Sequence, residues 1–284
     1  MERRNFIKAA GAAAITILLP DLLQAQQDAG KLSSFGIITG NTGGEWVKNN
    51  PKDALRKISR LGYKDLEFDG SFGMGIPELK NFLNNIGLNA LIGSTSMQAM
   101  DNTEQLKKDI ENCQLLDKKY IVCYWPWIDD GRNKKLDDWK QVAEKLNIGG
   151  EICRENGIQL LYHNHDIEFY LTEGKIPFDT LIENLDKNLV NIELDLYWIT
   201  KGEQSAVEFI QKYPGWFPVF HIKDMDHTSE KSFECVGNGR IDFTEIFKLN
   251  QTAGAKHFIV EHDNPANPKE CITASARYLS GLRF

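Results

Sequence analysis

Short apolar segments rich in β-branched and aromatic residues recur at regular intervals along the chain, between polar or glycine-containing segments. Such runs predict β-strands. Eight strands are predicted, over residues 35–39, 65–69, 88–92, 120–124, 158–162, 190–194, 219–223 and 257–261. Their near-continuous hydrophobicity is typical of parallel strands that are covered on both faces.

Amphipathic segments with helical spacing separate these strands. Helices are predicted over residues 53–61, 77–85, 103–116, 137–156, 177–185, 206–213, 243–253 and 268–279. Several of them begin at Pro or Asp and end at a glycine such as Gly62, Gly157 or Gly254, and these are ordinary signals for helix ends.

Eight strand–helix units in about 250 residues predict an α/β fold of the (β/α)₈ TIM-barrel type. An open, doubly wound sheet is the alternative. It usually has a Gly-x-Gly-x-x-Gly phosphate loop after its first strand, and residues 39–44 do not match that pattern. No linker interrupts the rhythm, so we predict a single domain over residues 30–284.

The first 25 residues have a different character. Arg3 and Arg4 precede the uncharged, Ala-rich segment 9–19, which is followed by Pro20 and a polar stretch around Ala25. This order is typical of a bacterial export signal, and the paired arginines resemble the twin-arginine type. The apolar segment is shorter than the ~20 residues that span a bilayer. We therefore predict that residues 1–25 are an export signal and that the mature protein is periplasmic, without a stable membrane anchor. An ordinary amphipathic helix is the alternative.

Composition and charge narrow the classes of function. With 42% hydrophobic and 10% aromatic residues, the chain is too apolar to be intrinsically disordered. Its formal net charge of −7 repels a phosphate backbone, so we expect no nucleic-acid partner. The five cysteines form no Cys-x-x-Cys pair, and their odd number does not predict a disulfide framework.

Ionisable residues gather where the predicted strands end, which is where TIM barrels place their chemistry. They are Glu67, Asp69, His163, His165, Asp166, Glu168, Glu193, Asp195, His221, Lys223, Asp224, His227, Glu261, His262 and Asp263. Residues two apart share one face of a strand, so we expect these side chains at the mouth of the barrel. His257 begins its strand at the opposite end and is interpreted as structural.

Carboxylates and imidazoles drawn from several strands suit a divalent cation. Mn²⁺, Mg²⁺, Co²⁺ or Zn²⁺ would accept such ligands, and the lack of neighbouring thiols argues against a Cys-rich structural zinc site. The sequence therefore predicts a site for a divalent metal ion. For each single residue, the alternative is a polar group at the barrel rim that is satisfied by its neighbours.

Five motifs resemble one family. They read Tyr-His-Asn-His-Asp-Ile-Glu-Phe at 162–169, Glu-Leu-Asp-Leu-Tyr-Trp at 193–198, His-Ile-Lys-Asp-Met-Asp at 221–226, Val-Gly-Asn-Gly-Arg-Ile-Asp-Phe at 236–243 and Val-Glu-His-Asp at 260–263. In this order they resemble the xylose-isomerase-like TIM-barrel family of sugar phosphate isomerases and epimerases. The resemblance covers the chain after the predicted signal.

The resemblance implies a metal held by residues from the fifth to the eighth strand. Asp195, His221 and Glu261 match the last three ligand positions. The family commonly has Glu-Asn-His at the end of the fifth strand, whereas this chain has His-Asn-His at 163–165. Either His163 takes the ligand position or Glu168 reaches back from the loop.

Roles in catalysis follow from the chemistry that such a site supports. A divalent ion that chelates a carbonyl and its neighbouring hydroxyl stabilises the enediolate formed when the α-proton leaves. We expect Glu261 to be the base, His165 the partner acid or base, and Lys223 a group that stabilises oxyanion charge. Alternatively, His165 only orients a ligand, and Lys223 pairs with Glu193 or Asp195.

Other residues are candidates for binding the substrate. Trp125 and Trp127 after the fourth strand, and Trp198 after the sixth, offer flat faces to a sugar ring, although tryptophans there also serve as loop core. Many family members have His at the position of Trp198. Glu67 is a further contact at the mouth, and Arg240 is a candidate for binding a substrate anion.

These observations predict a metal-dependent sugar isomerase or epimerase that removes the proton next to a sugar carbonyl. Export favours an unphosphorylated sugar or keto-glycoside as the small-molecule substrate. A lyase or hydrolase of 3-keto-glycosides using the same site is one alternative. A sugar-binding barrel without catalysis is another, which the changed ligand on the fifth strand keeps open. The family also contains DNA-repair endonucleases, but the negative charge and the export signal oppose that function.

Overall fold

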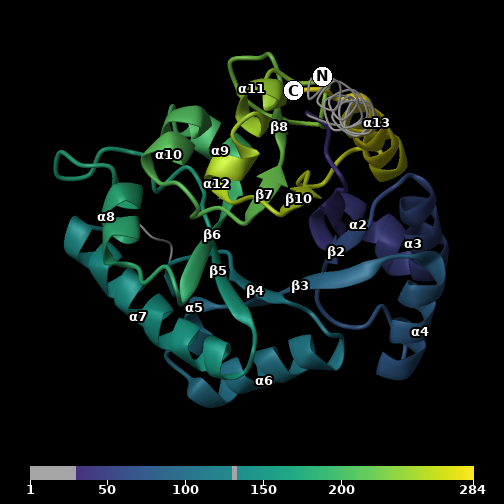
Figure 1. Ribbon diagram of the computed structural model, residues 1–284, viewed down its shortest axis with the longest axis horizontal. Coiled ribbons are helices and arrows are strands. Elements are labelled where there is room, and N and C mark those ends of the chain that lie inside the picture. The colour runs from purple at the N-terminus through teal and green to yellow at the C-terminus, as the bar shows by residue number, and fades with distance from the viewer. Residues whose placement is uncertain (1–29, 130–132) are drawn as a thin grey trace, which may run out of the picture.

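A closed barrel of parallel strands forms the centre of the computed structural model, which describes residues 30–129 and 133–284 (Figure 1). The strands are β1 (Gly36–Ile38), β2 (Asp65–Glu67), β3 (Asn89–Thr95), β4 (Tyr120–Cys123), β5 (Gln159–His163), β6 (Val190–Asp195), β7 (Val219–Ile222) and β10 (His257–Val260). Their order around the barrel is β1-β10-β7-β6-β5-β4-β3-β2, and the pairing of Ile37 with Val260 closes the ring. The predicted TIM barrel and its strands are confirmed. The predicted export signal lies outside the described residues.

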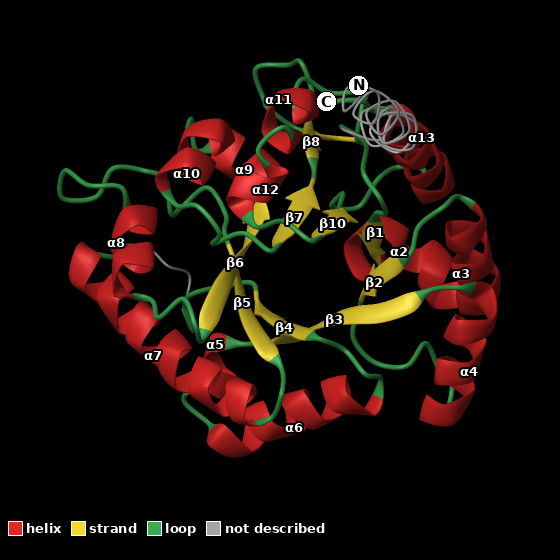
Figure 2. Cartoon of the chain, viewed as in Figure 1, coloured by secondary structure: helices red, strands yellow, loops and turns green. Residues whose placement is uncertain are grey.

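Helices surround the barrel, as the red ribbons outside the yellow strands of Figure 2 show. They are α2 (Thr39–Asn49), α3 (Pro51–Arg60), α4 (Ile76–Ile86), α5 (Met97–Met100), α6 (Thr103–Leu115), α7 (Leu136–Glu155), α8 (Pro177–Asn184), α9 (Leu196–Lys201), α10 (Ala206–Lys212), α11 (Phe243–Phe247), α12 (Asn250–Ala253) and α13 (Pro268–Gly281). Each predicted helix is present, although residues 243–253 form two helices, α11 and α12, rather than one.

Three helices were not predicted, namely α2, α5 and α9. The first half of α2 is rich in glycine, which disfavours helix, so it reads as a loop. In α9 the helix starts directly at the end of β6, because the side chain of Asp195 accepts a hydrogen bond from the backbone N–H of Trp198 and caps the helix. Because no loop separates β6 from α9, the sequence contains no turn residues that would predict the start of this helix.

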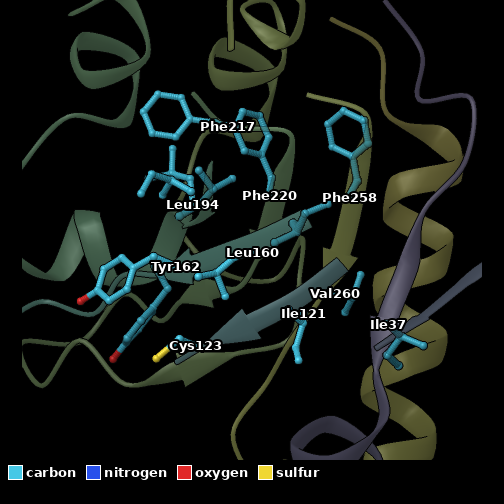
Figure 3. Packing of buried hydrophobic residues seen from close by; sticks show 14 of the residues in the cluster. Ile37, Ile121, Cys123, Leu160, Tyr162, Leu194, Phe217, Phe220, Phe258 and Val260 are labelled. Atoms are coloured by element: carbon cyan, nitrogen blue, oxygen red, sulfur yellow. The ribbon is translucent and has the colours of Figure 1, made fainter. Parts of the chain in front are cut away.

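The strands alternate between two apolar surfaces. Leu160, Leu194 and Phe258 belong to the large core that includes the helices, and Figure 3 shows them with their neighbours. Leu161 and Ile259, next to them in sequence, belong to a separate apolar cluster of barrel residues. This is the two-residue period of a strand, with one face toward the helices and the other toward the barrel axis.

The next inward-facing positions, two residues further along the strands, carry ionisable side chains instead of apolar ones. The inward position after Leu161 is His163, and the inward position after Ile259 is Glu261. The apolar cluster therefore forms a floor, and the carboxyl ends of the same strands place polar groups above it.

The loop after β7 is held by one buried carboxylate. This loop carries the two-stranded sheet of β8 (Asp224–Met225) and β9 (Phe233–Glu234). The carboxylate of Asp224 accepts hydrogen bonds from the backbone N–H groups of Gly237, Gly239 and Ile241. A Cβ at Gly239 would lie 2.3 Å from the Asp224 Oδ1 atom, so only glycine allows this close approach.

A disulfide bond between Cys235 and Cys271 joins this loop to α13. The two cysteines are 36 residues apart in sequence, and they follow β7 and β10, which pair side by side in the barrel. The odd cysteine count did not predict this bond. Cys113, Cys123 and Cys153 are buried and free.

No helix within residues 30–129 or 133–284 is long and apolar enough to cross a membrane.

The disulfide leads to a direct prediction. Protein that is denatured without a reductant should expose three reactive thiols per chain, and five after reduction, because two of the five cysteines are bonded to each other. Replacing both Cys235 and Cys271 with Ser should lower the free energy of unfolding by about 2–4 kcal/mol, since the bond restricts the unfolded chain. Thiol titration and urea unfolding measure these two effects. Five thiols before reduction would contradict the assignment.

Candidate metal centre

Four buried side chains from neighbouring strands converge at the carboxyl end of the barrel. His163 ends β5, Asp195 ends β6, His221 lies in β7, and Glu261 follows β10. One ligand atom from each lies within 4.8 Å of the others. The Nε2 atom of His163 is 3.9 Å from Asp195 Oδ2, and the Nδ1 atom of His221 is 3.0 Å from Glu261 Oε2.

This donor set fits a divalent cation. Asp195 uses its Oδ1 atom to cap α9, with the N–H of Trp198 2.7 Å away. Its Oδ2 atom is buried and has no hydrogen-bond partner in the described part of the chain. An unpaired carboxylate oxygen inside a protein is unfavourable, and a cation held by it and by two imidazoles would remove that cost. The cluster is therefore consistent with the metal site that the sequence predicts.

Asn164 holds two of these ligands in register. Its Oδ1 atom accepts a hydrogen bond of 2.9 Å from the N–H of Asp195, and its Nδ2 atom donates to the Asp195 carbonyl at 3.3 Å. The end of β5 is thus tied to the end of β6 by a side chain that follows His163 directly. This explains why a buried Asn stands between two histidines.

A second layer of carboxylates lies against the two imidazoles. Glu193 Oε2 is 3.1 Å from His163 Nδ1 and 3.2 Å from His221 Nε2. Glu67 Oε2 is 2.9 Å from His221 Nε2, and the hydroxyl of Tyr124 donates to Glu67. Sequence reasoning expected Glu67 to contact the substrate, but it is fully buried and does not line the cavity described below. Glu193 was predicted at a strand end, with an ion pair to Lys223 as its only suggested role.

The charges of the cluster are out of balance. Burial raises the pKa of Glu193 to about 8, and the neighbouring carboxylate of Glu67 adds to this effect. Burial also raises the pKa of Asp195 to about 8, against the opposing charge of Lys223. Burial alone would lower the pKa of His221, but Glu193 and Glu67 hold it well above its usual value. The protein thus buries more carboxylates than its own cations neutralise, which favours an added cation.

Glu261 has both oxygens engaged. Its Oε1 atom accepts from Asn41 Nδ2 at 3.0 Å, and its Oε2 atom lies 3.3 Å from Lys223 Nζ in addition to its contact with His221. Burial would raise the pKa of Glu261, but Lys223 and His221 hold it well below its usual range. Glu261 is therefore ionised, as a metal ligand must be.

Lys223 is a buried cation on the same side of the site. Its Nζ atom donates to Asp263 Oδ2 at 2.6 Å and lies over the rings of Phe233 and Trp198, at 4.6 and 5.0 Å from their centroids. Sequence reasoning left open an ion pair with Glu193 or Asp195. The ion pairs formed are with Glu261 and Asp263.

A cavity of about 900 Å³ opens beside the cluster. It extends from His163 and Glu261 to the start of α2, where Asn41 lines it, and to the loop after β2, where Asp69 lines it. This volume is within the range of small-molecule sites. Asn41 and Tyr124 were not predicted at the site, whereas Asp69 and Asp263 belonged to the predicted strand-end set without an assigned role. Tyr124 carried a signal, because it ends the predicted fourth strand on the same face as Val122.

His165 lines this cavity with an unused nitrogen. Its Nδ1 atom is buried and has no partner among residues 30–129 and 133–284. The ring packs between Trp125 and Trp198, with centroids 5.3 and 5.2 Å away. Burial lowers the pKa of His165 to about 4, and the charge of Lys223 acts in the same direction, so the imidazole is neutral at neutral pH.

Glu168 lies outside the ligand cluster. It is fully buried and accepts hydrogen bonds from the hydroxyl of Tyr162 and from the backbone N–H of His165, the latter at 2.9 Å. Of the two ligand candidates on the fifth strand, the structure places His163 in the cluster and gives Glu168 a supporting position.

The predicted aromatic platform is only partly present. Trp198 lines the cavity, whereas Trp125 and Trp127 do not. Trp127 is buried against Trp139, with ring centroids 4.7 Å apart, so it is loop core. Arg240 is exposed away from the cavity lining, and its guanidinium contacts the sulfur of Met225. No strand pattern governs these loop residues, which is why their directions did not follow from the sequence.

The chain resembles known proteins over most of its length. The family described as xylose isomerase-like TIM barrel matches residues 55–282, most of the chain. The chain belongs to this family. An inosose dehydratase from Clostridium perfringens is 26% identical over 222 residues, which cover 71% of this chain and 68% of that protein. An inosose dehydratase from Geobacillus kaustophilus is 26% identical over 227 residues, which cover 68% of this chain and 73% of that protein.

Solved structures agree with this assignment. A sugar phosphate isomerase/epimerase from Parabacteroides distasonis is 27% identical and superposes with a TM-score of 0.75, covering 89% of this chain and 95% of that one. A 3-keto-D-glucoside 4-epimerase from E. coli superposes with a TM-score of 0.65 at 17% identity, covering 87% and 98%. At that identity the second likeness shows the fold alone.

The buried carboxyl of Glu168 leads to a prediction of pH-dependent stability. Burial raises its pKa from 4.5 to about 7, so between these values the unfolded carboxyl loses its proton while the folded one keeps it. The free energy of unfolding should therefore fall as pH rises through this window, by on the order of 3 kcal/mol. Glu168→Gln lacks this titration. Urea unfolding from about pH 4 to about pH 8 should show wild type losing stability relative to the variant. A difference that does not change with pH would contradict the assignment.

Proposed function

We propose that this protein is a metal-dependent enzyme that removes the proton next to the carbonyl of a keto-sugar or a related ring ketone. The observation that carries the proposal is the buried cluster of His163, Asp195, His221 and Glu261 at one end of a sugar-sized cavity. Membership of a family with isomerase, epimerase and dehydratase members supports it.

Each ligand has a defined place in the proposal. The two imidazoles and two carboxylates would hold one divalent ion, with Asn164 keeping His163 and Asp195 in register. When bound, such an ion supplies Lewis-acid stabilisation of the negative charge that develops on the substrate as the proton leaves. The chain's own groups must then bind the substrate and move the proton.

His165 is the base that the geometry favours. It lies on the cavity wall with a free, buried Nδ1 atom, whereas both oxygens of Glu261 are already engaged by Asn41, His221 and Lys223. We therefore assign Glu261, the base expected from the sequence, to the ligand set. His165 takes the proton, and Lys223 faces the cavity as a fixed positive charge for the developing oxyanion.

The fate of the proton separates the possible reactions. Returning it to the same or the neighbouring carbon gives an epimerase or an isomerase, whereas delivering it to a departing oxygen gives elimination. Elimination is the second candidate, because the curated relatives in Clostridium perfringens and Geobacillus kaustophilus are named dehydratases. All of these outcomes share the first step, which is the one assigned here.

Export is part of the proposal. The segment with Arg3 and Arg4 supports it, and so does the bond between Cys235 and Cys271, because disulfides persist in oxidising compartments. In the periplasm the substrate would be an unphosphorylated sugar or keto-glycoside. The Trp198 ring and the Asp69 carboxylate on the cavity wall suit the apolar face and the hydroxyls of such a ring.

Metal content and a matched pair of variants test the proposed activity. We expect the purified protein to bind one divalent ion, and chelation should abolish turnover of keto-sugars until Mn²⁺, Co²⁺ or Zn²⁺ is restored. His165→Gln should lower kcat by about 10²–10⁴-fold with unchanged metal content, because it removes proton transfer only. Glu261→Gln should lose metal and activity together.

Metal analysis and steady-state kinetics give both readouts. Protein that holds no metal and is indifferent to added ions would refute the metal-dependent mechanism. A wild-type rate in His165→Gln would refute the choice of base alone. Tyr170→Phe is a suitable control, since that side chain is exposed and bonds only Asp166 in the described structure.

Export is tested in the cell. Replacing Arg3 and Arg4 with Lys should keep the precursor in the cytoplasm if the segment is a twin-arginine signal. Fractionation and detection of the cleaved form measure the outcome. Unchanged periplasmic delivery would exclude the twin-arginine route, and an uncleaved cytoplasmic wild type would exclude export altogether.

A further inference from the structure

Glu193 occupies a central place beneath the proposed metal ligands. It lies in β6, between β5 with His163 and β7 with His221. Its Oε2 atom is 3.1 Å from His163 Nδ1 and 3.2 Å from His221 Nε2, so one carboxylate oxygen contacts both imidazoles. We propose that Glu193 is a positioning residue that orients both imidazoles toward the metal. The inference rests on the proposed metal site and deepens it.

The contacts fix which nitrogen of each ring faces the cluster. In the metal-bound site, where Glu193 is ionised, its carboxylate only accepts hydrogen bonds, so the nitrogens that face it carry the hydrogens. These are Nδ1 of His163 and Nε2 of His221. In the metal-bound site the lone pairs are then left on Nε2 of His163 and Nδ1 of His221, the atoms that lie near Asp195 and Glu261; binding of the ion would displace the hydrogen through which His221 Nδ1 contacts Glu261 here. Both rings are thereby presented as neutral metal ligands.

Glu193 is buried with only the two imidazoles as hydrogen-bond or ion-pair partners of its side chain in the described structure. Its side chain is fully buried, its Oε1 atom has no hydrogen-bond partner, and no Lys or Arg pairs with it in residues 30–129 and 133–284. In the described structure the imidazole of His221 is the cationic partner of this carboxylate, and it is shared with Glu67 and Glu261, so the local negative charge is only partly offset. A divalent ion one imidazole away would supply the missing positive charge.

Glu67 and Glu168 set the scale for this role. Of the two imidazoles, the Glu67 carboxylate contacts only that of His221. It also accepts a hydrogen bond from the hydroxyl of Tyr124, so it supports a single ring. Glu168 is equally buried at the same end of the barrel but bonds Tyr162 and the backbone of His165, and neither imidazole of the ligand set. Glu168→Gln is therefore a matched control for removing a buried carboxylate.

The test measures metal binding to the metal-free protein. Glu193→Gln should weaken Co²⁺ binding about 10–100-fold and shift the visible absorption of the Co²⁺ form, because a neutral amide oxygen is a weaker acceptor for the two ring N–H groups than an ionised carboxylate. Glu67→Gln should weaken binding less than Glu193→Gln. Glu168→Gln should keep the dissociation constant within about twofold of wild type. Competition with a chelator gives the constants, and absorption reports the ligand geometry.

A second variant guards against misfolding. Glu193→Asp keeps the charge but withdraws it from the rings, so we expect a folded protein with an intermediate loss of Co²⁺ affinity. If both Glu193 variants bind Co²⁺ as tightly as wild type, with the same spectrum, the inference is wrong.

Stoichiometry separates this inference from its competitor and from the proposed function. Glu67, Glu193 and His221 also lie close enough to hold an ion of their own. Two ions per chain in wild type, falling to one in Glu193→Gln, would make Glu193 a ligand and overturn its positioning role. A wild-type protein that binds no divalent ion would overturn the proposed function itself, whereas wild-type binding with an unaffected Glu193→Gln overturns the inference alone.

Discussion

The two-residue period of the barrel strands is the constraint on which the whole site depends. Every second side chain must enter a closed interior that has little room and no free water. The lower inward positions hold apolar residues such as Leu161 and Ile259, and the next positions on the same strands hold His163 and Glu261. The same alternation of side chains therefore produces both the apolar floor and the polar cluster above it. A shift of one residue in a strand would turn the cluster residues toward the helices and the outer core residues toward the barrel axis.

Burial of charge is the second consequence of this geometry. Glu67, Glu193, Asp195 and Glu261 approach one another where solvent does not screen them, and Lys223 and His221 offset only part of their charge. Burial raises the pKa of Glu193 and of Asp195, while Lys223 keeps Glu261 ionised. A site of this kind is more stable when a cation enters it, which couples ligand binding to the stability of the barrel end.

The sequence predicts the strands, most helices and the ring of polar strand ends, because these depend on local periodicity. Asp195, His221 and Glu261 follow from the same pattern and from the motifs. The directions of loop residues do not, since Trp127 turns into the core against Trp139 and Arg240 turns away from the cavity. Which of His163 and Glu168 joins the cluster could be decided only from the three-dimensional structure. The same holds for the contacts of Glu67 and Glu193 with the imidazole rings.

The two carboxylate oxygens of Asp195 serve different parts of the structure. One oxygen begins helix α9 through the N–H of Trp198, and the other points to the ligand cluster. Because Trp198 is both on that helix and on the cavity wall, the position of this ring and the proposed metal position both depend on a single carboxyl group. Ion occupancy would therefore be felt along α9, and amide hydrogen exchange in Leu196–Lys201 would register it without any substrate present.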